Sequence, residues 1–489
     1  MALRARLVPT AAPARQAWPW HAVKCRCMPI SAMLGGDRRL DAETYLSSGH
    51  GIRASIEAQN GGWVRFGTVA HAWAPPRIKM VLVSPEHGTP YLNTSQIFDY
   101  RAIPRKWLAM EKITKAESRL AKQGTILLMA SASVGRSTLV TGIQEGCVLS
   151  HHFMRVEPVD PDQAGWIYAY LRSPQARAMM NGAQYASVIR HIEPHHVAAL
   201  PVPTVPENTA GDFKRRVHRI LDLRNESHRL TVEAEERFAQ AIGPIEFNQK
   251  EEGFVARASD MFSGHRRLEA SYHTPQAASI LARFKRADRL RDVAERVWWM
   301  PRFKRFYGDG GIPYLSADEL FTINPQETKR ILVDPGDNHH DYFVEPGWIV
   351  MACSGQVYGL NGAAAIITDY HANTFFSHDL IRIIADKSKI RAGYLLVSLT
   401  HRTHGRPILI RAAYGTSIPH LDPGDVADFP VVRLGDAVES GIADLAEASA
   451  KARAEADALE RQIAADAEAI ISRFIAHATG STSRRPYTQ

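Results

Sequence analysis

Two patterns in this 489-residue chain imitate motifs of catalytic sites. Residues 130–137 follow an apolar run and resemble a phosphate-binding loop, but Ala130 and Arg136 stand where that loop has Gly and Lys. Residues 306–310, Phe-Tyr-Gly-Asp-Gly, imitate a Phe-x-Gly-x-Gly loop that binds a methyl-donor cofactor. Basic residues precede them where an apolar strand is needed, and the companion Asn or Asp followed by Pro-Pro is missing. Neither motif therefore predicts a cofactor.

The 21 histidines do not form a recognisable metal or hydrolytic site. Adjacent pairs occur at 151–152, 195–196 and 339–340, without two further ligands at zinc spacing. No Ser-His-Asp arrangement can be placed from the sequence. We expect a non-enzymatic chain that binds no cofactor.

Basic residues interleaved with aromatic ones suggest a different chemistry, contact with a polyanion. The chain carries a formal net charge of +8 and has a pI near 9.2. One basic run spans 101–122 and includes Trp107, and another spans 283–305 and includes Trp298 and Trp299. Both runs flank a Gly-x-Pro-Tyr-Leu block, at 88–92 and 311–315. This pairing favours phosphate contact over an ordinary solvated helix face.

These blocks belong to an internal repeat, which determines the expected architecture. Five short blocks recur in the same order, about 223 to 229 residues apart. The matched ranges are 38–42 with 266–270, 88–92 with 311–315, 124–131 with 347–353, 150–155 with 377–382, and 185–194 with 414–423.

Each copy is followed by a long amphipathic segment, where apolar or small residues recur every three or four positions. The first, 207–242, would form a helix about 54 Å long at 1.5 Å per residue. Its Ala- and Ser-containing seam is typical of close, coiled-coil pairing. We therefore predict an α+β fold with two pseudo-twofold-related globules, separated by two long antiparallel helices that form a coiled-coil spacer.

Two globules that each end in a block such as Tyr414-Gly-Thr-Ser-Ile-Pro-His-Leu-Asp-Pro423, followed by a long helix, resemble the specificity subunit of type I restriction-modification systems. Residues 212–223 are similar to the spacer helix of that family, and the resemblance covers about residues 37–476. It implies that each globule is a target-recognition domain that reads one half of a split site in double-stranded DNA. It also implies that the helices set the gap and dock two DNA adenine methyltransferase subunits, and that a restriction (translocase) subunit joins the complex in phage defence.

The expected organisation follows from the repeat and this resemblance. It comprises a poorly ordered N-terminal extension (1–36, with Met28 or Met33 as possible starts), target-recognition domain 1 (37–205), spacer helix 1 (206–245), target-recognition domain 2 (246–434), spacer helix 2 (435–476) and a disordered tail (477–489).

Candidate DNA-binding residues are those that differ inside matched loops or lie in the basic runs, since matched residues cannot distinguish two half-sites. Tyr185, Tyr414, His191 and His420 match and are assigned to the scaffold or to backbone contact. The candidates are Arg101, Arg105, Lys106, Arg136, Arg190, Arg302, Lys304, Arg305, Gln356 and Tyr358.

Two other classes of function stay open. The chain could be a fused DNA methyltransferase and endonuclease with an unrecognised cofactor site, or a scaffold that binds only proteins. The four scattered cysteines fit neither a disulfide framework nor a zinc site, and no apolar run reaches the roughly 18 residues of a membrane helix. A cytoplasmic location is expected, with no membrane partner.

Overall fold

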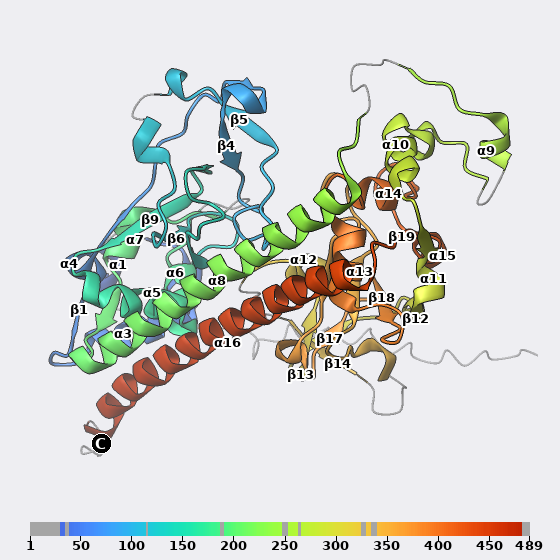
Figure 1. Ribbon diagram of the computed structural model, residues 1–489. Coiled ribbons are helices and arrows are strands. Elements are labelled where there is room, and N and C mark those ends of the chain that lie inside the picture. Colours follow the sequence, from blue (N-terminus) through green and yellow to red (C-terminus); the bar gives the residue numbers. More distant parts are fainter. Residues whose placement is uncertain are drawn as a thin grey trace, which may run out of the picture.

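The computed structural model describes residues 30–34, 39–113, 116–185, 190–246, 253–262, 266–323, 329–333 and 340–481. Within them, two globules of mixed helix and strand pack on two long helices, α8 (Glu207–Ile242) and α16 (Asp436–Ser481), which run diagonally across Figure 1. The expected mixture of helix and strand is confirmed, as is a long helix after the first globule.

The two long helices are antiparallel. Contacts between them pair rising residue numbers in α8 with falling numbers in α16. Arg216 forms an ion pair with Asp466, and the Arg224 guanidinium lies 2.9 Å from the Glu460 carboxylate. Further along α8, the Ser227 hydroxyl donates to the Ser449 carbonyl oxygen at 3.0 Å. Helix α8 ends at Ile242, and the following Gly243 has a φ of 93°, which is easily reached without a Cβ, while its N–H still bonds to the Ala239 carbonyl.

The first globule is built on a four-stranded antiparallel sheet in the order β2-β9-β6-β7. A second sheet has the order β3-β5-β4-β8, and β1 pairs with β10 beside them. Its strands are β1 (Trp63–Arg65), β2 (Ala70–Trp73), β3 (Leu82–Val83), β4 (Thr89–Leu92), β5 (Lys106–Leu108), β6 (Ile126–Met129), β7 (Ser137–Leu139), β8 (Val148–Leu149), β9 (Phe153–Pro158) and β10 (Pro201–Pro203). Its helices are α2 (Ala42–Leu46), α3 (Ser48–Glu57), α4 (Phe66–Val69), α5 (Ala164–Arg172), α6 (Pro174–Gly182) and α7 (Pro194–Ala198).

The second globule has a four-stranded sheet in the order β12-β18-β15-β16, with β14-β13-β17 and β11-β19 beside it. Its strands are β11 (Ala287–Arg289), β12 (Ala294–Trp299), β13 (Phe306–Leu315), β14 (Arg330–Leu332), β15 (Ile349–Ala352), β16 (Ala364–Ile366), β17 (Phe375–Phe376), β18 (Leu380–Ala385) and β19 (Pro430–Val432). Its helices are α9 (Ala258–Phe262), α10 (Pro275–Arg283), α11 (Leu290–Val293), α12 (Ala317–Leu320), α13 (Ala392–Thr400), α14 (Arg406–Ile410) and α15 (Pro423–Ala427).

The two main sheets use their strands in the same order of sequence. β2, β6, β7 and β9 of the first copy correspond in order to β12, β15, β16 and β18 of the second. A short parallel pairing also recurs, Tyr91 with Val148 and Tyr314 with Phe375. The matched blocks of sequence therefore form matching strands.

Each globule shares its core with one end of the helix pair. The first core joins β6 and β9 to the beginning of α8 and the end of α16, and the second joins β15 and β18 to the opposite ends. Gly165 of α5 and Gly393 of α13 allow the close approach of the short helices. A Cβ on either would lie 2.3–2.4 Å from the backbone of α8 or α16.

Both termini are described only in part. Residues 1–29, 35–38 and 482–489 lie outside the described residues, and with them most of the expected extension and tail. Residues 30–34 form α1 (Ile30–Leu34), and α16 continues to Ser481, beyond the expected boundary at 476. Among the described helices, none combines the length and apolarity needed to cross a bilayer.

Candidate nucleic-acid interface

The ten candidate residues lie in four parts of the structure. Arg101, Arg105, Arg136, Gln356 and Tyr358 lie where the two globules meet. The second group comprises Arg302, Lys304 and Arg305, in the segment before β13, while Lys106 opens β5 of the first globule. Arg190 stands apart, beside the repeated Tyr-His block.

Arg136 is held against the other globule. Its guanidinium carbon lies 3.6 Å from the centre of the Phe98 ring, and Nη2 is 3.5 Å from the Thr322 hydroxyl oxygen. Burial is the largest cause that lowers the pKa of Arg136 to about 10, and neighbouring Arg177 and Arg172 contribute to the same shift. Arg136 thus stays charged at neutral pH, in the contact between the globules.

Arg101 and Arg105 also reach the second half of the molecule. Arg101 forms an ion pair with Glu235 of α8, and burial raises the pKa of Glu235 although Arg101 opposes that effect. The Arg105 guanidinium lies 5.5 Å from the centre of the Tyr358 ring. Gln356 Nε2 donates to the Ser417 carbonyl at 3.1 Å. Residues expected on separate readers therefore meet.

A short backbone bridge accompanies these side chains, and the sequence reasoning missed it. Asp99 pairs with Thr322 in an antiparallel bridge. The Tyr100 N–H donates to the Phe321 carbonyl at 3.2 Å, and the Ile323 N–H donates to the Phe98 carbonyl at 2.7 Å. A signal was available, because Gln96-Ile97-Phe98 and Glu319-Leu320-Phe321 extend the repeated Gly-x-Pro-Tyr-Leu block.

The segment before β13 presents charge and aromatic surface to solvent. Lys304 lies 5.0 Å from the centre of the exposed Phe306 ring, and the neighbouring Tyr307 is half exposed. Arg305 lies 6.0 Å from the Tyr314 ring centre and 3.9 Å from Asp379. Cations in such a segment can contact phosphates, and the exposed aromatic rings beside them can stack on bases.

The repeated Tyr-His block forms the same small structure in both copies. Tyr185 and His191 exchange two backbone hydrogen bonds at 3.0 Å, and Tyr414 and His420 exchange two at 2.9 and 2.7 Å. The role expected for these residues, in the scaffold or in backbone contact, stays a prediction. Arg190, next to His191, forms an exposed ion pair with Glu43 at 2.9 Å.

The two motif-like segments have local structures unlike the loops they imitate. Residues 130–136 connect the antiparallel strands β6 and β7, whereas a phosphate-binding loop leads from a strand into a helix. Residues 306–310 lie within strand β13. Among the described residues, no three His, Cys, Asp or Glu side chains are grouped to hold a metal ion.

Comparisons with known proteins give structural neighbours only. No protein-family model matches the chain, and no curated protein matches it. The chain is similar to a type I restriction-modification S subunit from M. genitalium (12% identity, TM-score 0.31, 87% of this chain and 98% of that one). It is also similar to the HsdS subunit from Thermoanaerobacter tengcongensis (16%, TM-score 0.25, 83% and 97%).

A third neighbour is the type IIG restriction endonuclease BpuSI (10% identity, TM-score 0.27), which overlaps 36% of this chain and 28% of its own. These overlaps are too loose to transfer a function or a residue role. The proposal below therefore depends on the repeat, the helix pair and the charged segments of this chain.

Proposed function

We propose that this chain is the non-catalytic DNA-recognition subunit of a type I restriction-modification or related phage-defence complex. The observation that carries the proposal is that one sheet order occurs twice, at opposite ends of an antiparallel helix pair. Two such readers related by a pseudo-twofold axis would contact a duplex at two separated places. The recognised DNA would then be bipartite, with a gap of fixed length.

The dimensions of the helix pair suit this role. α8 has 36 residues, or about 54 Å at 1.5 Å per residue. One turn of B-DNA is about 34–36 Å long, so the rod spans roughly one and a half turns. Coiled-coil packing of its Ala- and Ser-containing seam would keep the rod stiff enough to define the gap.

DNA contact is assigned first to the exposed candidates that lie away from the contact between the globules. Arg302, Lys304 and Arg305 lie beside the half-exposed rings of Phe306 and Tyr307, and Lys106 and Arg190 are exposed on the first globule. Lys and Arg at such places neutralise phosphates, and Arg can also read guanine in the major groove. Arg101 and Arg136 instead take part in the contact between the globules.

The proposed partners follow from the same assignment. Two DNA adenine methyltransferase subunits would dock on the helix pair, a restriction (translocase) subunit would join them, and the complex would act in the cytoplasm. The solvent face of α8 carries ion pairs such as Arg229 with Glu226 and Glu233. These charges offer a polar docking surface that leaves both globules free for DNA.

Salt-dependent duplex binding by the purified chain tests the proposal. Neutralisation of several phosphates predicts a steep negative slope of log K against log salt, about 0.9 per phosphate. A slope near zero would instead favour a scaffold that binds only proteins.

Calorimetric titration with S-adenosylmethionine tests the other alternative, the fused methyltransferase. The proposal requires no binding of this methyl donor by the isolated chain. Saturable binding would contradict it.

A further inference from the structure

Residues 98–101 of the first globule cross to the second globule and to the helix pair. Their backbone forms the bridge to residues 321–323, with Asp99 opposite Thr322. We call the contact of 98–101 with 321–323 the inter-globule tie. It is a direct contact between the two globules, in addition to their attachment along α8 and α16.

The tie is symmetric in a way that the repeat explains. Phe98 and Phe321 occupy the same position of the repeat, 223 residues apart, and so do Asp99 and Thr322. One hydrogen bond runs from Tyr100 to Phe321, and the other runs from Ile323 back to Phe98. Each copy thus gives and receives the same bond, as in an isologous twofold interface.

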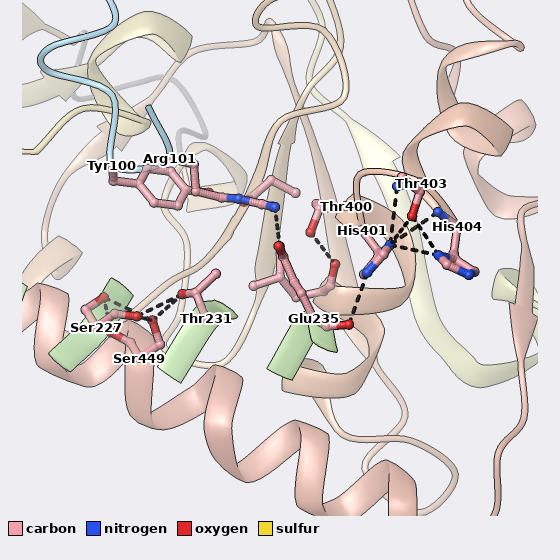
Figure 2. A network of polar contacts seen from close by, with 12 residues as sticks. Tyr100, Arg101, Ser227, Thr231, Glu235, Thr400, His401, Thr403, His404 and Ser449 are labelled. Atoms are coloured by element: carbon pink, nitrogen blue, oxygen red, sulfur yellow. Dashed lines mark hydrogen bonds and ion pairs between the residues drawn. The ribbon is translucent and has the colours of Figure 1, made fainter. Parts of the chain in front are cut away.

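Side chains anchor the tie to the second half of the molecule. The Tyr100 hydroxyl donates to the Ala364 carbonyl at 2.6 Å. The Arg453 guanidinium of α16 lies 4.4 Å from the centre of the Tyr100 ring. Figure 2 shows Arg101 reaching Glu235 of α8, in the same region as Thr231 and Ser449. These residues line a cavity of about 40 Å³, large enough to hold water.

We propose that the inter-globule tie is a second positioning element, which fixes the separation of the two readers together with the helix pair. Its consequence for DNA rests on the proposed function above. A gap longer by one base pair moves a half-site about 3.4 Å along the duplex and about 35° around it. A direct contact between the globules opposes any movement of one globule against the other about the rod.

An engineered disulfide tests the tie without any reference to DNA. Asp99 and Thr322 form a non-hydrogen-bonded antiparallel pair, for which the Cα atoms are about 4.5 Å apart. This spacing is within the disulfide range of about 4.4–6.8 Å. We expect Asp99→Cys with Thr322→Cys, in a Cys25→Ser and Cys27→Ser background, to cross-link almost completely in oxidised glutathione.

The single-cysteine variants are the matched controls, and peptide mass spectrometry identifies the 99–322 bond. Cys147 and Cys353 are buried and should not compete. Cross-linking of the double variant no greater than in the controls would overturn the tie.

Loss of the anchors tests the effect on DNA spacing. For the variant Tyr100→Ala with Arg101→Ala, we expect unchanged half-site sequences but at least a tenfold loss of discrimination against gaps one base pair too long or too short. Adding the 99–322 disulfide to this variant should restore the discrimination, which a general loss of stability would not allow.

The two possible failures are distinguishable. Unchanged spacing discrimination in a variant that still binds duplex would refute the tie as a positioning element. Absence of duplex binding by the unaltered chain would refute the proposed function, whereas the cross-link would still support the contact.

Discussion

Replacement of Arg224 by Ala should destabilise the helix pair strongly. The Arg224 side chain is 4% exposed, and its two partners on α16, Asp457 and Glu460, are 6% and 3% exposed. Burial alone would lower the pKa of Arg224, but the two carboxylates raise it overall, so the guanidinium stays charged. Glu460 also accepts a hydrogen bond from the Tyr168 hydroxyl at 2.7 Å. The cluster therefore joins α8, α16 and α5.

The magnitude follows from what the substitution leaves behind. Without Arg224, the two buried carboxylates lose the cation that is bonded directly to both, although Arg172 still interacts electrostatically with Glu460. Removal of one partner from a buried ion pair costs about 3–5 kcal/mol. Simultaneous replacement by Arg224→Met, Asp457→Leu and Glu460→Met should instead be neutral or stabilising by about 1–4 kcal/mol, because all three members of the ion cluster are then apolar.

Urea unfolding followed by circular dichroism measures both variants. Arg229→Ala is a matched control on the same helix, since its ion pairs with Glu226 and Glu233 are exposed and its unfolding transition should not move. If Arg224→Ala lowered the free energy of unfolding by less than about 1 kcal/mol, the view that Arg224 forms a buried ion cluster with the two carboxylates would be refuted.

Three further outcomes are expected. Burial raises the pKa of Asp99 to about 6, although the charges of Arg105 and Arg136 oppose this shift. The folded state therefore binds the proton of Asp99 more tightly than the unfolded state does. As a result, the free energy of unfolding should fall by up to about 3 kcal/mol as pH rises from about 4 to 6. Asp99→Asn should therefore unfold at a higher temperature than the unaltered chain at pH 7 but not at pH 4, and an equal difference at both would contradict this. Phe238→Ala should cost about 3–5 kcal/mol in urea unfolding because Phe238 is fully buried against Tyr394, and a loss under 1 kcal/mol would be inconsistent with that packing. Lys304→Ala with Arg305→Ala should weaken binding of all duplexes alike and reduce the salt slope by about 1 per lost phosphate contact, whereas an unchanged slope would remove these residues from the interface.

The sequence predicts the elements that depend on local pattern. The apolar run 125–130 contains β6 and the run 348–352 contains β15, because short apolar segments between turn residues become buried strands. Residues 392–400 form one helix, α13, whereas α5 and α6 are separate helices divided at Ser173, because Pro174 starts a new helix.

Contacts that depend on how the globules meet could not be predicted. Arg136 has the sequence signature of a DNA-binding residue, but Thr322 of the second globule lies beside it only because the helix pair brings the two globules together. Asp99 carries no periodic or motif signal, so its burial depends on tertiary structure alone. Lys304 and Arg305 needed no such information, because the basic and aromatic run already indicated an exposed charged segment.

Selection of binding sequences from a random pool of duplexes tests the central claim most directly. The purified chain, or its complex with methyltransferase subunits, is mixed with the pool, and the bound duplexes are sequenced. We predict two short, different motifs separated by a gap of constant length and no sequence preference. Enrichment of a single uninterrupted motif, or of no motif at all, would contradict the account.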